Sequence, residues 1–158
     1  MPVNALTGND SAALRIVDDL SHKRAQDTWF QALYLPAIRA RIEINHGNGT
    51  KAVELLKSAP SYDQGNAEIL ALRGQAFLAN HQLQDAEREF QSAMKLKNEG
   101  WQNPNCWLSQ LYLARTYAAE GDSAKARAAY QDFFAMWKDA DPGLPLLATA
   151  KAEYAKLQ

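Results

Sequence analysis

The amino-acid sequence predicts an all-α protein built from repeated helix pairs. One observation behind this prediction is a set of small and aromatic residues that occurs twice with the same internal offsets. Another is that no segment alternates apolar and polar residues with the period of a β-strand, in a chain rich in helix-forming residues. The length of 158 residues favours a single domain, residues 1–158, that is large enough to bury a hydrophobic core. The repeat is the strongest observation, because internal repetition decides the architecture before single residues are considered.

The repeated set comprises a small residue, an aromatic, a second small residue, a second aromatic and a final apolar residue. Neighbouring members within each predicted helix are three or four residues apart, so they share one helical face. We expect the small residues where two helices approach closely and the aromatic residues in the space between helices. The first copy consists of Gly74, Phe77, Ala86, Phe90 and Ala93, and the second of Ala114, Tyr117, Ala126, Tyr130 and Phe133.

These residues resemble the signature of the tetratricopeptide repeat, and the resemblance implies a right-handed α-solenoid of about three repeats. A third and weaker copy lies ahead of these two in the sequence and carries Ala40 and Ala52. Ala52 precedes Ala86 by the 34-residue repeat length of this family. Glu43 occupies the usual aromatic position of that copy, so the first repeat is degenerate. The implied repeats are residues 33–66, 67–100 and 107–140.

Further helices are expected at both ends of the array. Residues 11–26 are amphipathic and look like the second helix of a preceding repeat whose first helix is missing. Residues 144–158 place Leu147 and Tyr154 on one stripe, with lysines and Glu153 opposite. We therefore expect a terminal capping helix, with one face on the last repeat and the other in water.

Composition and motifs argue against several classes of function. The formal net charge of −1 disfavours nucleic acid and anionic membranes as partners. No signal peptide is visible, and no stretch approaches the ~20 apolar residues of a membrane span. The lone Cys106, expected just before a helix, cannot form an internal disulfide and has no designated base. His22, His46 and His81 lack metal-ligand spacing, and no phosphate-loop or kinase motif is present. We therefore expect a non-catalytic cytoplasmic protein without a metal or cofactor.

The resemblance also implies a binding surface, because the first helix of each tetratricopeptide repeat lines a concave groove. At these positions Arg41, Gln75 and Arg115 would form a polar row flanked by apolar contacts. Arginine holds carboxylates by paired hydrogen bonds, so an acidic or C-terminal peptide is a suitable ligand. The alternative is that the arginines pair with nearby glutamates or face water. The chain lacks the lysine and asparagine clamp of chaperone-binding members. The candidate partner-binding residues are Tyr34, Arg41, Gln75, Leu108, Arg115 and Trp101.

The four tryptophans receive different expectations. Trp107 and Trp137 are expected to seal the packing between repeats, and Trp29 to lie in the core. Trp101 lies in the inserted connection before the third repeat, where packing has less need of an aromatic residue. It is a candidate contact residue because exposed aromatics often anchor interfaces. The alternative is that it folds back onto Pro104 or the neighbouring helix.

A narrower resemblance covers nearly the whole chain. Its distinctive segments are residues 34–40, 126–134, 137–142 and 150–157. They look like the C-terminal repeat region of large acidobacterial proteins, which carry a eukaryotic-like serine/threonine kinase or a winged-helix regulator ahead of the repeats. The implied function is a protein-interaction module, the sensor or scaffold part of a bacterial signalling protein. A membrane-anchored kinase would place this module in the periplasm instead of the cytoplasm.

Two functions of other classes remain open at this point. A truncated solenoid exposes an apolar N-terminal edge that could pair with a second copy, making the chain a self-associating structural unit. An enzyme with an unrecognised site is the third hypothesis. It would require an activity that is lost when Arg41 or Arg115 is changed.

Overall fold

The computed structural model describes residues 10–57, 66–96, 104–141 and 143–157, and every regular element in these ranges is helical. The predicted all-α class is therefore confirmed, whereas the division into tetratricopeptide repeats stays a prediction. The elements are α2 (Asp10–Lys23), η1 (Phe30–Tyr34), α3 (Leu35–Asn45), α4 (Gly49–Leu56), α5 (Ala67–Ala79), α6 (Leu83–Lys95), α7 (Pro104–Glu120), α8 (Ser123–Met136) and α9 (Pro145–Ala155).

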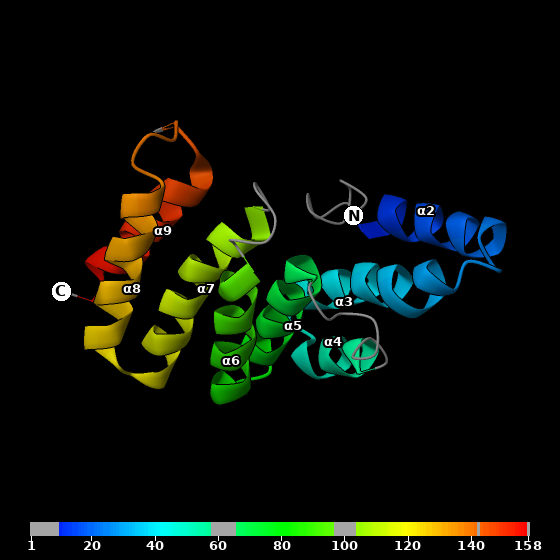
Figure 1. Ribbon diagram of the computed structural model, residues 1–158, viewed down its shortest axis with the longest axis horizontal. Helices are drawn as coiled ribbons and strands as arrows, with labels where there is room; N and C mark the ends of the chain where they lie inside the picture. The colour runs from blue at the N-terminus through cyan, green and yellow to red at the C-terminus, as the bar shows by residue number, and fades with distance from the viewer. Residues whose placement is uncertain (1–9, 58–65, 97–103, 142, 158) are drawn as a thin grey trace.

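The helices form an elongated row in which each one packs on the next along the chain, from α2 to α9 (Figure 1). In addition, α5 contacts both α3 and α7, although other helices separate these three in sequence. Side chains from α3, α5 and α7 can therefore meet one another, and these are the helices that carry most of the candidate binding residues.

The helix ends differ slightly from those expected. The helix expected at residues 11–26 is α2, and the one expected at 144–158 is α9. Helix α7 begins at Pro104, before the expected start at residue 107, so the backbone of Cys106 lies inside a helix and not ahead of it. Proline favours a first helical position, because its φ is already helical and its missing N–H has no partner to lose there. No described helix combines the length and apolar character needed to cross a membrane.

Short turns and polar caps make successive helices antiparallel neighbours. Gly47 and Gly121 have φ angles of 76° and 81°, in the left-handed region that glycine adopts without a steric cost. The Asn66 side chain accepts two backbone N–H groups in the first turn of α5. Asp122 accepts the backbone N–H of Lys125 at 3.0 Å at the start of α8. These caps satisfy donors that have no partner inside the helix.

A π-helical turn, η1, leads directly into α3. The backbone N–H of Leu35 donates to the carbonyl of Phe30, five residues earlier. Pro36 follows, and in an α-helix its ring would clash with the carbonyl four residues before it, to which it could donate no hydrogen bond. The wider π-turn relieves this conflict, so the helix continues through the proline.

The predicted small residues lie at close contacts between helices. A Cβ atom on Gly74 would lie 2.6 Å from the ring of Phe90, so glycine makes room for that aromatic side chain. Gly49 at the start of α4 is equally tight, with a Cβ position 2.5 Å from the backbone carbonyl carbon of Ala79 in α5. The alanines of the signature are fully buried: Ala40, Ala52, Ala86, Ala93, Ala114 and Ala126.

The character of the core changes along the row. Aliphatic residues such as Leu33, Leu56 and Leu72 fill the space among α3, α4 and α5. Aromatic residues dominate from α6 onwards, where Phe90 is buried with α7, and Tyr130 with α9. The remaining aromatic residues of the signature, Phe77 and Tyr117, are partly buried and pack against these clusters.

The tryptophans correct one expectation. Trp29 is 54% exposed and does not lie in the core. The next residue, Phe30, takes the buried position, and successive residues point about 100° apart around a helix. Trp107 is also exposed, in the first turns of α7. Trp137 does pack, with its ring 5.4 Å from that of Phe133. Trp101 lies outside the described residues.

Candidate functional site

The structure brings two of the three predicted polar residues together. Nη1 of Arg41 in α3 donates to Oε1 of Gln75 in α5 at 2.5 Å, across 34 residues of sequence. Arg115 in α7 belongs to the same predicted row but makes its hydrogen bonds elsewhere. The predicted row therefore has two parts: Arg41 and Gln75 bridge α3 and α5, and Arg115 is paired separately.

The guanidinium of Arg41 is withdrawn from water without a matching carboxylate. Burial lowers the pKa of Arg41, and Tyr112 and Glu68 act in the opposite direction. Among the described side chains, Glu68 attracts Arg41 but forms no ion pair with it. Nε of Arg41 is buried and has no hydrogen-bond partner. Because arginine stays protonated in proteins, this position holds a desolvated cation with unused donor capacity.

Arg115 is paired with a carboxylate, whereas no described residue supplies one to Arg41. Glu153 of α9 accepts from Nε of Arg115 at 2.9 Å and from Nη2 at 3.0 Å, which is the paired arrangement that arginine favours. The hydroxyl of Tyr130 donates to the same carboxylate at 2.8 Å. Burial alone would lower the pKa of Arg115, but the hydrogen bonds and charge of Glu153 raise it. Arg115 therefore follows the alternative interpretation of the sequence, in which the arginines pair with glutamates of the same chain.

Glu153 corrects a second expectation. It was expected on the water-facing side of the capping helix, yet it points to Arg115 and Tyr130. Its position could have been found by treating α9 as the first helix of another unit. Arg41 and Gln75 are 34 residues apart, and Arg115 and Glu153 are 38 apart, so each contact joins similar positions on such helices.

Tyr112 was not among the predicted residues, and it lies between the two arginines. Its ring stacks on Phe90 with centroids 5.6 Å apart. The guanidinium carbon of Arg115 lies 5.1 Å from the Tyr112 ring centroid, and Tyr112 also acts on Arg41. Because it is one helical turn before Arg115, Tyr112 shares the face of α7 that points along the row.

The apolar candidates lie at the ends of this face. Tyr34 is 42% exposed and lies about two helical turns before Arg41. Leu108 is partly buried and lies about two turns before Arg115. The described candidates therefore lie along α3, α5 and α7 as a surface, and are not gathered in one enclosed pocket. Trp101 is the exception, because it falls outside the described residues.

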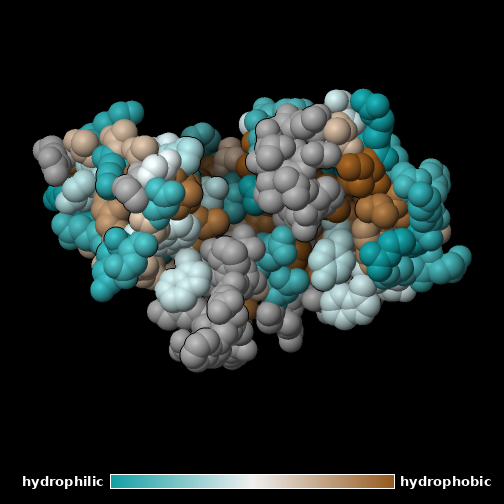
Figure 2. Space-filling view, turned by 90° about the horizontal axis from the view of Figure 1, so that it is seen from above, coloured by the Kyte–Doolittle hydropathy of each residue, from teal (hydrophilic) through white to brown (hydrophobic). Residues whose placement is uncertain are grey.

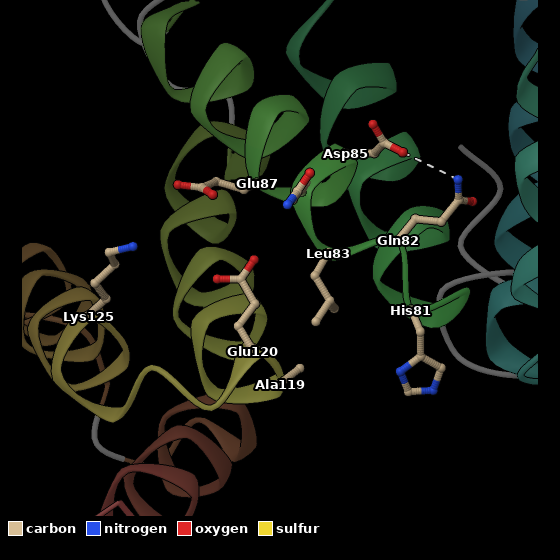
Figure 3. A pocket seen from close by; sticks show the side chains of 9 residues that line it. His81, Gln82, Leu83, Asp85, Glu87, Ala119, Glu120 and Lys125 are labelled. Carbon is tan, nitrogen blue, oxygen red and sulfur yellow. Dashed lines mark hydrogen bonds between the residues drawn. The ribbon is translucent and has the colours of Figure 1, made fainter.

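A separate hollow of about 740 Å³ lies between the α5–α6 turn and the α7–α8 turn (Figure 3). Two of its acidic side chains, Asp85 and Glu87, have partners. Glu87 accepts from the hydroxyl of Tyr117 at 2.8 Å, and burial together with Glu87 raises the pKa of Tyr117 to about 12. Within the described residues, no group of three histidine, cysteine or carboxylate side chains is arranged to hold a metal ion. The ionisable residues around the hollow include His81, Asp85, Glu87, Glu120 and Lys125.

The chain matches no family model, no curated protein and no solved structure.

Proposed function

We propose that this chain is a non-catalytic protein-interaction module whose helix pairs are tetratricopeptide-like repeats. The pairs would be α3 with α4, α5 with α6, and α7 with α8, flanked by the half-repeat α2 and the cap α9. Three observations support this right-handed solenoid: sequential packing of all helices, the additional contacts of α5 with α3 and α7, and the buried signature residues. The proposal includes neither a catalytic step nor a cofactor.

The partner is a peptide or protein segment that binds along α3, α5 and α7. The observation that carries this proposal is the partly buried Arg41, whose charge forms no ion pair and whose Nε has no hydrogen-bond partner among the described residues. Desolvating a cation costs free energy unless a partner compensates for it, so such a group is more readily explained by binding than by stability. The exposed ring of Tyr34 offers apolar contact area on the same surface.

Selection from a random peptide library on the folded protein tests this proposal. Tyr34 is replaced in one variant by the photo-cross-linking residue p-benzoylphenylalanine, and Arg88, an exposed residue of α6, is replaced in a matched control. We expect selected peptides to cross-link at position 34 and not at position 88. Failure to select any peptide, or equal cross-linking at both positions, would contradict the proposed binding surface.

The resemblance to acidobacterial signalling proteins supports a place in a larger bacterial polypeptide, in the cytoplasm or, behind a membrane anchor, in the periplasm. An antibody against this domain would measure the mass of the native product in its source cells. A product several times larger than 17.6 kDa supports that proposal. A product of this mass contradicts it and leaves a free-standing adaptor.

Self-association is the second candidate function, and a specific feature of α2 favours it. Leu14 and Ile16 are each 40% exposed on the helix that ends the row. Figure 2 shows hydrophobic surface, in brown, on the upper face at this end of the molecule. Light scattering over a range of concentrations would separate the two functions. A mass that doubles with concentration, and returns to the monomer value in Leu14→Ser plus Ile16→Ser, supports self-association.

A further inference from the structure

Helix α9 has the features of a first helix that lacks its second helix. Glu153 in α9 corresponds to Gln75 in α5, because each contacts the first helix before its own. The residue before Gln75 is the buried Gly74, and the ring of Phe90 in α6 lies directly against it. The residue before Glu153 is Ala152, which is exposed. No described helix follows α9 to cover it.

Helix α2 has the features of the opposite half, a second helix without a first one. Its buried Ala13 and Val17 are four residues apart, as are the buried Ala86 and Phe90 in α6. Val17 packs in one cluster with Ile38 of α3, the first helix that follows. One side of α2 is therefore covered by the next pair, as expected for a second helix.

Ile16 marks the side of α2 that its own first helix would cover. In α6 the residue before Phe90 is Glu89, which pairs with Arg73 of its own first helix, α5, at 2.8 Å. The residue before Val17 is Ile16, which is 40% exposed. No described helix precedes α2. The row thus ends in one uncovered first helix and one uncovered second helix.

From these two edges we infer that copies of this chain associate head to tail, with α9 of one copy packed against α2 of the next. The contact would complete one helix pair from its two halves. Helices α2 and α9 lie at opposite ends of the row (Figure 1), so a single copy does not bring them together. The inference rests on the proposed repeat arrangement and gives self-association, the second candidate function, a defined geometry.

The charges of the two edges are complementary. The outer face of α9 carries two exposed lysines, Lys151 and Lys156, while its carboxylate, Glu153, turns inward to α7. On α2, Asp19 lies one helical turn after Ile16 and shares its side of the helix. The present ion pair of Asp19 within α2 is exposed, and such pairs add little stability. Two α9 faces would repel each other, so contact between unlike ends is favoured.

Sedimentation equilibrium of the wild-type protein, Ile16→Arg and Ala152→Arg tests this inference. Each substitution places a long charged side chain on one of the two edges, at an exposed position. The mass of the wild-type protein should rise with concentration beyond twice 17.6 kDa, because every added copy leaves one free end of each kind. Each variant alone should stay at 17.6 kDa.

An equal mixture of the two variants separates unlike from like ends. The intact α2 of Ala152→Arg should bind the intact α9 of Ile16→Arg, giving a species of twice 17.6 kDa and nothing larger. Ala128→Arg, at an exposed alanine of α8, is the matched control and should associate as the wild-type protein does. If circular dichroism shows that Ile16→Arg is unfolded, Asp19→Lys, at a side chain that is 56% exposed, replaces it.

Three results would overturn the inference. A wild-type dimer that survives Ala152→Arg but not Ile16→Arg would mean that α2 pairs with a second α2. Association that persists in both variants would place the contact elsewhere. A wild-type mass that stays at 17.6 kDa at every concentration would remove self-association as well. None of these results bears on peptide binding, which the library selection tests separately.

Discussion

The two ends of the helix row are covered in different ways. At the C-terminal end, α9 adds aromatic contacts, with the ring of Tyr154 centred 6.1 Å from Tyr130 and 5.8 Å from Phe134. It also adds a charge, because Glu153 pairs with Arg115. This end, called the closed end below, therefore receives both an apolar cover and an electrostatic partner.

At the N-terminal end, called the open end below, α2 supplies an apolar cover, and its ion pair joins Asp18 to the exposed Arg39 of α3 and not to Arg41. Ala13 and Val17 are fully buried against α3 and the residues around it, but Leu14 and Ile16 remain exposed on the same helix. No described residue forms an ion pair with Arg41. A terminal helix can therefore complete a hydrophobic core while a partly buried arginine stays without an ion pair among the described residues.

We expect the greatest loss of stability from a substitution in the middle of the row, on which both ends depend. Ala86→Asp places a charge in the fully buried contact between α6 and α7, which should unfold the array. Ala128→Asp makes the same change at an exposed position of α8 and should leave the thermal transition nearly unchanged. Circular dichroism measures both, and similar melting of the two variants would contradict the packing of α6.

Truncating one aromatic residue at each end tests whether the closed end is packed more firmly. Phe133→Ala should lower the free energy of unfolding by about 3–5 kcal/mol, because its fully buried ring leaves a cavity among other aromatic rings. Phe30→Ala should cost less, about 2–3 kcal/mol, because neighbours at the open end can relax into the space. Urea denaturation measures both, and equal losses would remove the distinction between the ends.

Removing the charge of Glu153 makes the closed end resemble the open one. Glu153→Gln should lower the free energy of unfolding by roughly 1–2 kcal/mol, because the partly buried Arg115 loses its carboxylate. Lys23→Gln breaks an exposed ion pair with Asp19 and should change stability by less than about 0.5 kcal/mol. Similar small losses in the two variants would show that α9 closes its end by apolar contact alone.

The smallest effect concerns acid and the two capping aspartates. The backbone N–H of Phe30 lowers the pKa of Asp27, and the backbone N–H of Lys125 lowers that of Asp122. A carboxylate with a lowered folded-state pKa stabilises the fold above its unfolded value of 3.8, and this contribution is lost as pH falls through the folded value. Asp27→Asn and Asp122→Asn should each flatten the fall of Tm below pH 4. If Tm falls as steeply below pH 4 in both variants as in the wild-type protein, the lowered pKa values of Asp27 and Asp122 would be contradicted.

The helical class could be predicted from the sequence because its evidence is local. Phe90 and Ala93 are spaced along one helical face, and the small Gly74 on the preceding helix, opposite the large Phe90, indicates a close helix contact. The exposure of Trp29 could not be predicted so easily, since a rotation of one residue exchanges it with the buried Phe30. Whether a side chain at the edge of a helical face is buried depends on where the neighbouring helix lies, and the local pattern does not specify that position.

The candidate site was predictable only in part. Arg41 and Gln75 were placed in one row by their repeat positions, and they do touch. The partner of Arg115 was missed, because the register of the last helix depends on a turn and on tertiary packing and not on the repeat itself. Glu153 could have been found from the sequence only by treating α9 as the first helix of another unit, because charge pairing between distant helices leaves no periodic signal of its own.

The contact at Gly49 has a consequence for the shape of the row. Backbone atoms of Ala79 and Asn80 occupy the space that a Cβ at this position would need, at 2.5 Å. Backbone cannot move aside as the end of a flexible side chain can, so any larger residue would act as a wedge between α4 and α5. The approach of α4 to α5 is thus set where two main chains touch, by the single hydrogen atom that glycine carries in place of a side chain.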